Sequence, residues 1–115
     1  MPDSQAVVPL ELGVQEARQL LAEQSAMLLL DCRNQHEFEF VHIEGACFIP
    51  MDEISERVRE IDEFRSRRII VYCHLGGRSL HVASWLRQQG FQQAQSMTGG
   101  VDAWAEQIDV SLPRY

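Results

Sequence analysis

The chain has 115 residues, enough for one ordinary domain with a single hydrophobic core. Hydrophobic residues make up 45% of it and charged residues 23%, which are proportions typical of soluble globular proteins and not of disordered or membrane-embedded chains. The formal net charge is −7 and all ten basic residues are arginines spread along the chain, so nucleic acid is not an expected partner.

The first third of the chain predicts a helix, a strand and a loop, in that order. Apolar side chains recur at helical spacing from residue 13 to about residue 24, with polar side chains between them, and this pattern predicts an amphipathic helix. The run Met27–Leu30 is continuously apolar and ends at Asp31, which is typical of a short strand buried on both faces of a sheet. Residues 33–42 are mostly polar, and we expect a loop there.

The middle of the chain predicts two further strands with a helix between them. Residues 46–49 form a short apolar run that ends at Pro50. Asp52 is placed to cap a helix with one apolar stripe, made by Ile54, Val58 and Ile61. The run Ile69–Tyr72 is β-branched and aromatic, and it is the clearest strand in the sequence.

The last third predicts a helix, a strand and a final short helix. A helical stripe of Ser79, Val82, Ala83 and Leu86 ends near Gly90, because glycine favours helix termination. A weaker strand pattern covers 92–97, and a short helix is expected over 101–107, after two glycines. Strands that alternate with helices predict an α/β fold with a mainly parallel central sheet and helices on both faces.

The segment "VYCHLGGRS", residues 71–79, is the most informative part of the sequence. In α/β sheets the binding crevice lies beyond the carboxyl ends of the strands, and Cys73 stands at that point of the clearest strand. The glycines allow the loop to turn its N–H groups inward, and the helix that follows adds the positive end of its dipole. We therefore expect the Cys73 thiol to ionise readily and to act as a nucleophile. The alternative is a small buried apolar side chain beside an ordinary turn.

The cysteines and histidines do not form a recognisable metal site. The three cysteines, Cys32, Cys47 and Cys73, have no C-x2-C spacing, and the four histidines show no H-x3-H spacing. No metal and no disulfide framework are expected, and we interpret Cys32 and Cys47 as core residues. The sequence shows no secretory signal and no membrane span, which predicts a cytoplasmic protein.

Three motifs, in order, resemble those of the rhodanese-like sulfurtransferase family, in its single-domain form. The first runs from Asp31 to Phe38 ("DCRNQHEF") and continues with "HIEGA" at 42–46 and Ile-Pro at 49–50. The second is the loop from Cys73 to Arg78, followed by Ser79, and the third combines the glycine pair at 99–100 with Ala-Trp at 103–104. The likeness extends from about Val8 to Trp104. It implies one rhodanese-like domain over residues 1–115, with 1–7 and 111–115 as tails.

The resemblance also implies an activity and its residues. Cys73 would be the catalytic residue and would accept a sulfane sulfur as a persulfide, while the loop residues bind the substrate; these are His74, Leu75, Gly76, Gly77 and Arg78. The donor would be a small anion such as thiosulfate, or a persulfide-carrying protein, and the acceptor a thiol or cyanide. No cofactor is implied. Histidine is only partly charged near pH 7, so Arg78 is the one permanent cation of the loop, and we expect weak thiosulfate binding.

Two other functions are compatible with the same fold. One is a catalytically silent module that only binds a partner, although such a module has no need of a nucleophile in an anion-binding loop. The other is a phosphatase or arsenate reductase, whose loop in relatives has five residues between cysteine and arginine instead of the four found here.

Several polar residues outside the loop are expected to have structural roles. Arg33 and Glu37 could pair across a helical turn. Asp31 is expected to accept loop N–H groups, and His42 to hold the segment leading to Gly45. If Cys32 lay close to Cys73, it could resolve the persulfide as a disulfide, which the sequence does not decide.

Overall fold

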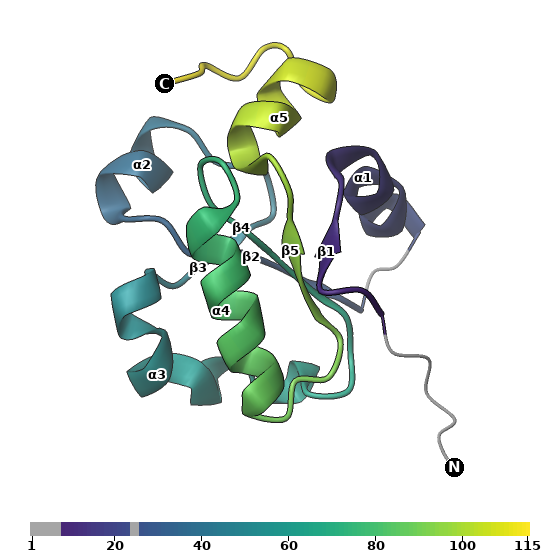
Figure 1. Cartoon of the computed structure of the whole chain (residues 1–115). Coiled ribbons are helices and arrows are strands. Elements are labelled where there is room, and N and C mark those ends of the chain that lie inside the picture. The colour runs from purple at the N-terminus through teal and green to yellow at the C-terminus, as the bar shows by residue number, and fades with distance from the viewer. Residues whose placement is uncertain (1–7, 24–25) are drawn as a thin grey trace.

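The computed structural model describes residues 8–23 and 26–115 and contains one five-stranded sheet with helices on both faces (Figure 1). All strand pairs are parallel, in the order β1-β5-β4-β2-β3. The strands are β1 (Glu11–Leu12), β2 (Leu28–Asp31), β3 (Cys47–Phe48), β4 (Ile69–Tyr72) and β5 (Ala94–Met97). The predicted α/β fold with a parallel central sheet is therefore confirmed. The tail predicted over 1–7 lies outside the described residues.

The helices form two layers around this sheet. They are α1 (Val14–Glu23), α2 (Gln35–Phe40), α3 (Ile54–Arg57), α4 (Gly77–Gln88) and α5 (Gly100–Gln107), with 3-10 helices η1 (Met51–Glu53) and η2 (Val58–Phe64). One core cluster packs α3, η2 and α4 against one face of the sheet, and a second packs α1 and α5 against the other. Strands β2 and β4 are buried on both faces because their side chains alternate between these two clusters.

The register between β2 and β4 aligns the two strand ends that carry the principal motifs. Leu30 is paired with Val71 and Asp31 with Tyr72, and the Cys32 N–H continues the ladder by donating to the Tyr72 carbonyl at 3.1 Å. The first motif and the Cys73 loop therefore leave the sheet side by side, although about 40 residues separate them in the chain.

The prediction of a loop over residues 33–42 was wrong, because this segment contains α2. Asn34 caps the helix by accepting the Glu37 N–H at 2.9 Å, while the Glu37 carboxylate accepts the Asn34 N–H at 3.2 Å. This reciprocal capping box is encoded by Asn34-x-x-Glu37 and stabilises a helix that has no buried residues. The polarity that suggested a loop reflects a helix lying on the surface.

The helix predicted to start at Asp52 is broken into three short pieces. Asp52 lies inside η1, whose N-cap residue is Pro50, and makes no side-chain cap. The backbone then passes through α3 and η2, with a kink at Ile61 (φ −115°). The predicted apolar stripe still faces the core: Ile54 and Ile61 are buried and Val58 packs against the same cluster.

Strand β1 was not predicted, because two residues carry too little pattern to identify a strand. Its position is fixed by β5: Glu11 pairs with Ser96 and Leu12 with Met97. The Ser96 N–H donates to the Leu10 carbonyl at 2.7 Å. Strand β1 therefore forms one edge of the sheet, and β3 forms the other.

No helix among the described residues is long and apolar enough to cross a membrane.

Candidate active site

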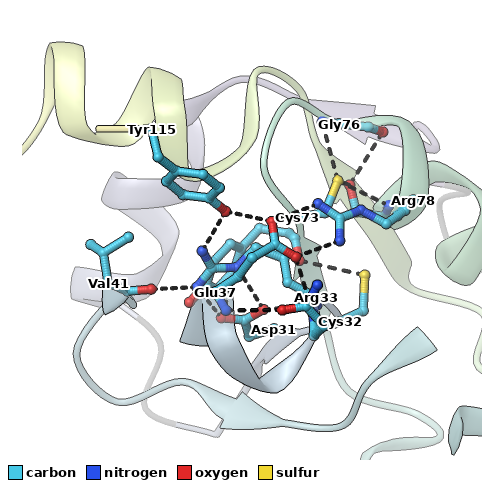
Figure 2. Close-up of polar contacts among 12 residues, drawn as sticks. Asp31, Cys32, Arg33, Glu37, Val41, Cys73, Gly76, Arg78 and Tyr115 are labelled. Carbon is cyan, nitrogen blue, oxygen red and sulfur yellow. Dashed lines mark hydrogen bonds and ion pairs between the residues drawn. The ribbon is translucent and has the colours of Figure 1, made fainter. Parts of the chain in front are cut away.

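The Cys73 sulfur lies at the end of β4, surrounded by hydrogen-bonding groups from the start of α4 (Figure 2). The N–H groups of Gly76 and Ser79 point at Sγ, at 3.2 and 3.3 Å. The thiol in turn lies 3.4 Å from the Ser79 hydroxyl oxygen, to which it can donate. The residue is only 1% exposed, so the sulfur lies at the floor of its loop. These donors would favour a negative charge on any sulfur atom held there.

The loop takes this shape because of one glycine within it and one outside it. Gly76 has φ +118° at the N-cap of α4, a conformation that side chains disfavour. Gly100 lies directly against the loop, and a Cβ atom there would collide with the carbonyls of Cys73 and His74. That close approach lets α5 bind the same carbonyls: the Val101 N–H donates to Cys73 at 2.9 Å and the Asp102 N–H to His74 at 3.2 Å.

Ser79 connects the loop to the interior of the sheet. It is fully buried, and its hydroxyl group lies 2.7 Å from that of Ser96 on β5 and 3.3 Å from the Gly76 carbonyl. Because α4 begins at Gly77, the Ser79 N–H is among the first N–H groups of the helix and has no partner within it. The helix therefore supplies both an N–H donor and the positive end of its dipole to Cys73.

Arg78 makes a paired contact with Glu37 instead of lying free at the mouth of the loop. Its two terminal nitrogens lie 2.7 and 2.9 Å from the two carboxylate oxygens of Glu37, a fork geometry (Figure 2). The Arg78 hydrogen bonds, with help from the Tyr115 hydroxyl and the Asn34 N–H, lower the pKa of Glu37 to about 2. Glu37 thus stays ionised at any pH suited to an assay, and it offsets the charge of Arg78.

The Arg33 guanidinium is buried beside the site and paired with Asp31, so the predicted Arg33–Glu37 pair was wrong. Asp31 and Arg33 are 0% and 1% exposed, and their closest contact is 2.6 Å. Arg33 also donates to the Val41 carbonyl at 2.5 Å and to the Tyr115 hydroxyl at 2.7 Å. Asp31 accepts the Arg33 backbone N–H at 3.0 Å, as expected for this position. Arg33 thereby links the end of β2 to the C-cap residue of α2, Val41.

The C-terminal segment, expected as a tail, has no helix or strand but folds over the site. The ring of Tyr115 stacks on His74 with a centroid distance of 3.9 Å, and its hydroxyl donates to Glu37 at 2.7 Å. Arg114 pairs with Asp102 on α5 at 3.0 Å. Beneath Tyr115, the Nε2 atom of His74 is buried without a hydrogen-bond partner among the described residues. The histidine ring is therefore covered and does not project freely into the mouth.

The remaining histidines, His36, His42 and His81, lie outside the Cys73 loop. His42 stacks on Phe38 and its Nδ1 lies 2.9 Å from the Phe38 carbonyl, so it fastens the end of α2. His36 and His81 are exposed. Among the described ranges 8–23 and 26–115, no three His, Cys, Asp or Glu side chains are arranged to hold a metal ion.

The structure brings the predicted loop residues together and adds partners that sequence reasoning missed. Gly76 contributes an N–H to Cys73, whereas Leu75 is 63% exposed at the rim. Ser79 was predicted only as a helix residue. Glu37 could have been identified as a helix-capping residue from Asn34-x-x-Glu37, but nothing local indicates its pairing with Arg78. Tyr115 carries no sequence signal at all.

Comparisons with known proteins find relatives for most of the chain. A family model described as the rhodanese-like domain matches residues 13–107. A sulfurtransferase of Allochromatium vinosum is 34% identical over 95 residues, covering 83% of this chain and 87% of that protein. The putative sulfur carrier protein YrkF of Bacillus subtilis is 30% identical over 94 residues, covering 82% of this chain. The chain spans half the length of YrkF and a smaller share of several other curated relatives.

Solved structures show the same fold. The human single-domain sulfurtransferase TSTD1 superimposes with a TM-score of 0.76 at 24% identity, covering 87% of this chain and 98% of that one. At this identity the likeness concerns the fold and not the details of the site.

Proposed function

Because this chain belongs to the rhodanese-like domain family, which includes single-domain sulfurtransferases, we propose that it transfers sulfane sulfur through a persulfide on Cys73. One observation carries the proposal: the Cys73 sulfur lies within hydrogen-bond reach of the N–H groups of Gly76 and Ser79, at the N-terminus of α4. That environment suits a sulfur atom that is negatively charged both before and after it accepts a second sulfur.

The proposed reaction is a double displacement. The Cys73 thiolate attacks the outer sulfur of the donor, for example thiosulfate; the sulfur–sulfur bond of the donor breaks, and sulfite leaves with the bonding electrons. A thiol or cyanide acceptor then attacks the terminal sulfur of the persulfide, which restores the Cys73 thiolate. The N–H groups of Gly76 and Ser79, which face the sulfur, would stabilise its charge in both states, and no cofactor is needed.

The electrostatics of the mouth favour a persulfide over thiosulfate as the donor. Arg78 would be the natural partner of a dianion, but its two terminal nitrogens already bind the Glu37 carboxylate, at 2.7 and 2.9 Å. The protein's net charge of −7 adds a weak repulsion. A persulfide on a protein or small thiol depends less on charge recognition. We therefore propose measurable but low-affinity use of thiosulfate, with a persulfide carrier as the better donor.

Replacing Glu37 with glutamine is expected to lower the KM for thiosulfate about threefold to tenfold, because it frees the charge of Arg78 without removing its side chain. Steady-state kinetics of the two proteins at pH 7 and several ionic strengths measure this. Since the added attraction is electrostatic, the difference should shrink as salt increases. Glu39→Gln, on the same helix, serves as the matched control. An unchanged KM in Glu37→Gln would mean that Arg78 takes no part in donor binding.

A phosphatase activity is not proposed, because only four residues separate Cys73 from Arg78 and the Arg78 fork is already filled by a carboxylate. A partner-binding module without catalysis would not need donors aimed at a cysteine sulfur. Intact-mass spectrometry before and after thiosulfate distinguishes these functions. We expect one added sulfur atom on Cys73, removed by cyanide with formation of thiocyanate. A protein that takes up no sulfur from thiosulfate or from a small-molecule persulfide would refute the proposed activity.

A further inference from the structure

Cys32 and Cys73 occupy matching positions at the ends of two adjacent parallel strands. Asp31 pairs with Tyr72, and the Cys32 N–H donates to the Tyr72 carbonyl at 3.1 Å, so the next residues along both strands, Cys32 and Cys73, lie side by side. Neighbouring strands are about 4.8 Å apart. That spacing falls within the range of about 4.4–6.8 Å between Cα atoms that a disulfide requires.

Both side chains also point to the same side of the sheet. Cys32 and Cys73 belong to the same core cluster, under α4, and each is 1% exposed. The Cys32 thiol donates to the Tyr72 carbonyl at 3.5 Å. Figure 2 shows its sulfur below the Cys73 loop, on the side away from Tyr115. The Cys32 sulfur thus lies on the same side of the sheet as Cys73, and a disulfide between them would leave the strand pairing unchanged.

We propose that Cys32 is a resolving cysteine, which forms a reversible disulfide with Cys73 after an oxidant such as hydrogen peroxide has converted Cys73 to a sulfenic acid. This inference goes beyond sulfur transfer, since it requires only that a small oxidant reaches Cys73. It assigns Cys32 the role of protecting the reactive sulfur from irreversible oxidation.

The atoms and electrons of the two steps balance with peroxide as the only oxidant. The Cys73 thiolate attacks one peroxide oxygen, the oxygen–oxygen bond breaks, and hydroxide leaves, which gives the sulfenic acid. The Cys32 sulfur then attacks Cys73 Sγ and displaces the hydroxyl group, which leaves as water with the proton of the Cys32 thiol. A small thiol reductant restores both cysteines by thiol–disulfide exchange.

The charge on the Cys73 side chain would favour reaction of Cys32 with a sulfenic acid over reaction with a persulfide. Burial and, next, the negative charge of Cys73 raise the pKa of the Cys32 thiol well above its usual range. A persulfide keeps negative charge beside Cys32, so Cys32 remains a protonated, poor nucleophile. A sulfenic acid is neutral, so its formation removes that repulsion, whereas the larger effect of burial remains. The Cys32 thiol therefore reacts in its protonated form and loses its proton to the leaving hydroxyl group. The sulfur destined for an acceptor is thus preserved, while the oxidised cysteine is captured.

Cys47 provides a matched control within the same protein. It lies on β3, on the far side of β2 from β4, where it pairs with Leu30. It is partly exposed, which makes it at least as accessible to reagents as the other two cysteines. Its position nonetheless gives it no route to a disulfide with Cys73 within one chain.

The test treats the reduced full-length protein with increasing hydrogen peroxide, followed by peptide mapping with and without reduction. We expect one Cys32–Cys73 disulfide in the parent and in Cys47→Ser, with sulfur transfer lost and then recovered on reduction. In Cys32→Ser and Cys32→Val, Cys73 should instead proceed to sulfinic and sulfonic acid, with activity that reduction does not restore. Two variants are used because a hydroxyl and an aliphatic side chain perturb the core differently.

Equal overoxidation of Cys73 in the parent and both Cys32 variants, with no Cys32–Cys73 peptide, would overturn the proposal. A parallel sample treated with thiosulfate separates it from the proposed activity, because sulfur loading is measured there without peroxide. That sample should carry the added sulfur on Cys73 and a free Cys32. Formation of the disulfide with release of hydrosulfide in that sample would overturn the charge argument.

Discussion

Cys73→Ser is expected to lower the rate of sulfur transfer by about a thousandfold or more, because the hydroxyl group remains protonated and cannot form a persulfide. Serine fits the same space and can donate to Ser79 Oγ as the thiol does. The measurements are transfer of sulfur from thiosulfate or a small-molecule persulfide to cyanide, and intact mass after exposure to the donor.

The controls separate chemistry from folding. Cys47→Ser should retain transfer, as should Cys32→Ser under reducing conditions. Thermal unfolding of Cys73→Ser should differ from that of the parent by no more than about 1 kcal/mol in the free energy of unfolding. If folded Cys73→Ser transferred sulfur at the parental rate, the assignment of the nucleophile would be wrong.

Arg33→Leu is expected to lower the free energy of unfolding by about 3–5 kcal/mol, the largest effect on stability that we expect from one substitution. Arg33 lies 2.6 Å from Asp31, and both side chains are fully buried. Removing the guanidinium leaves a buried carboxylate without its cation, and it also deprives the Val41 carbonyl and the Tyr115 hydroxyl of a donor. Denaturant unfolding monitored by circular dichroism measures the loss.

Two comparisons make this prediction specific to the buried ion pair. The double variant Asp31→Asn with Arg33→Leu should be less destabilised than Arg33→Leu alone, because no charge is left unpaired. Arg57→Ala removes the contacts of Arg57 with Glu53 and Glu60, which lie near the surface. This substitution should lower the free energy of unfolding only slightly. If the single and double variants lost the same free energy of unfolding, the unpaired charge of Asp31 would not be the cause of the destabilisation.

Much of the fold could be predicted from local sequence. Strand β4 matches its predicted range, and α1, β2, α4, β5 and α5 fall within a few residues of theirs. In these segments the pattern reports burial directly, because both faces of the sheet are covered and every β4 side chain is apolar or aromatic. The errors had three different causes: α2 has no buried residues, β1 has only two residues, and the helix from Asp52 is interrupted by a kink at Ile61 although its apolar stripe is buried.

By itself the sequence determined the local arrangement around Cys73: a cysteine at a strand end, a glycine turn and a helix start, all within the seven residues from Cys73 to Ser79. These features are local, because the N–H groups that face the sulfur come from residues three and six positions later. Only the tertiary structure decided the charge at the mouth of the loop and the residue that lies beside Cys73. Glu37 reaches Arg78 across 41 residues, Tyr115 reaches Glu37 across 78, and Cys32 meets Cys73 through strand register. Such contacts depend on how distant segments pack, which no local pattern encodes.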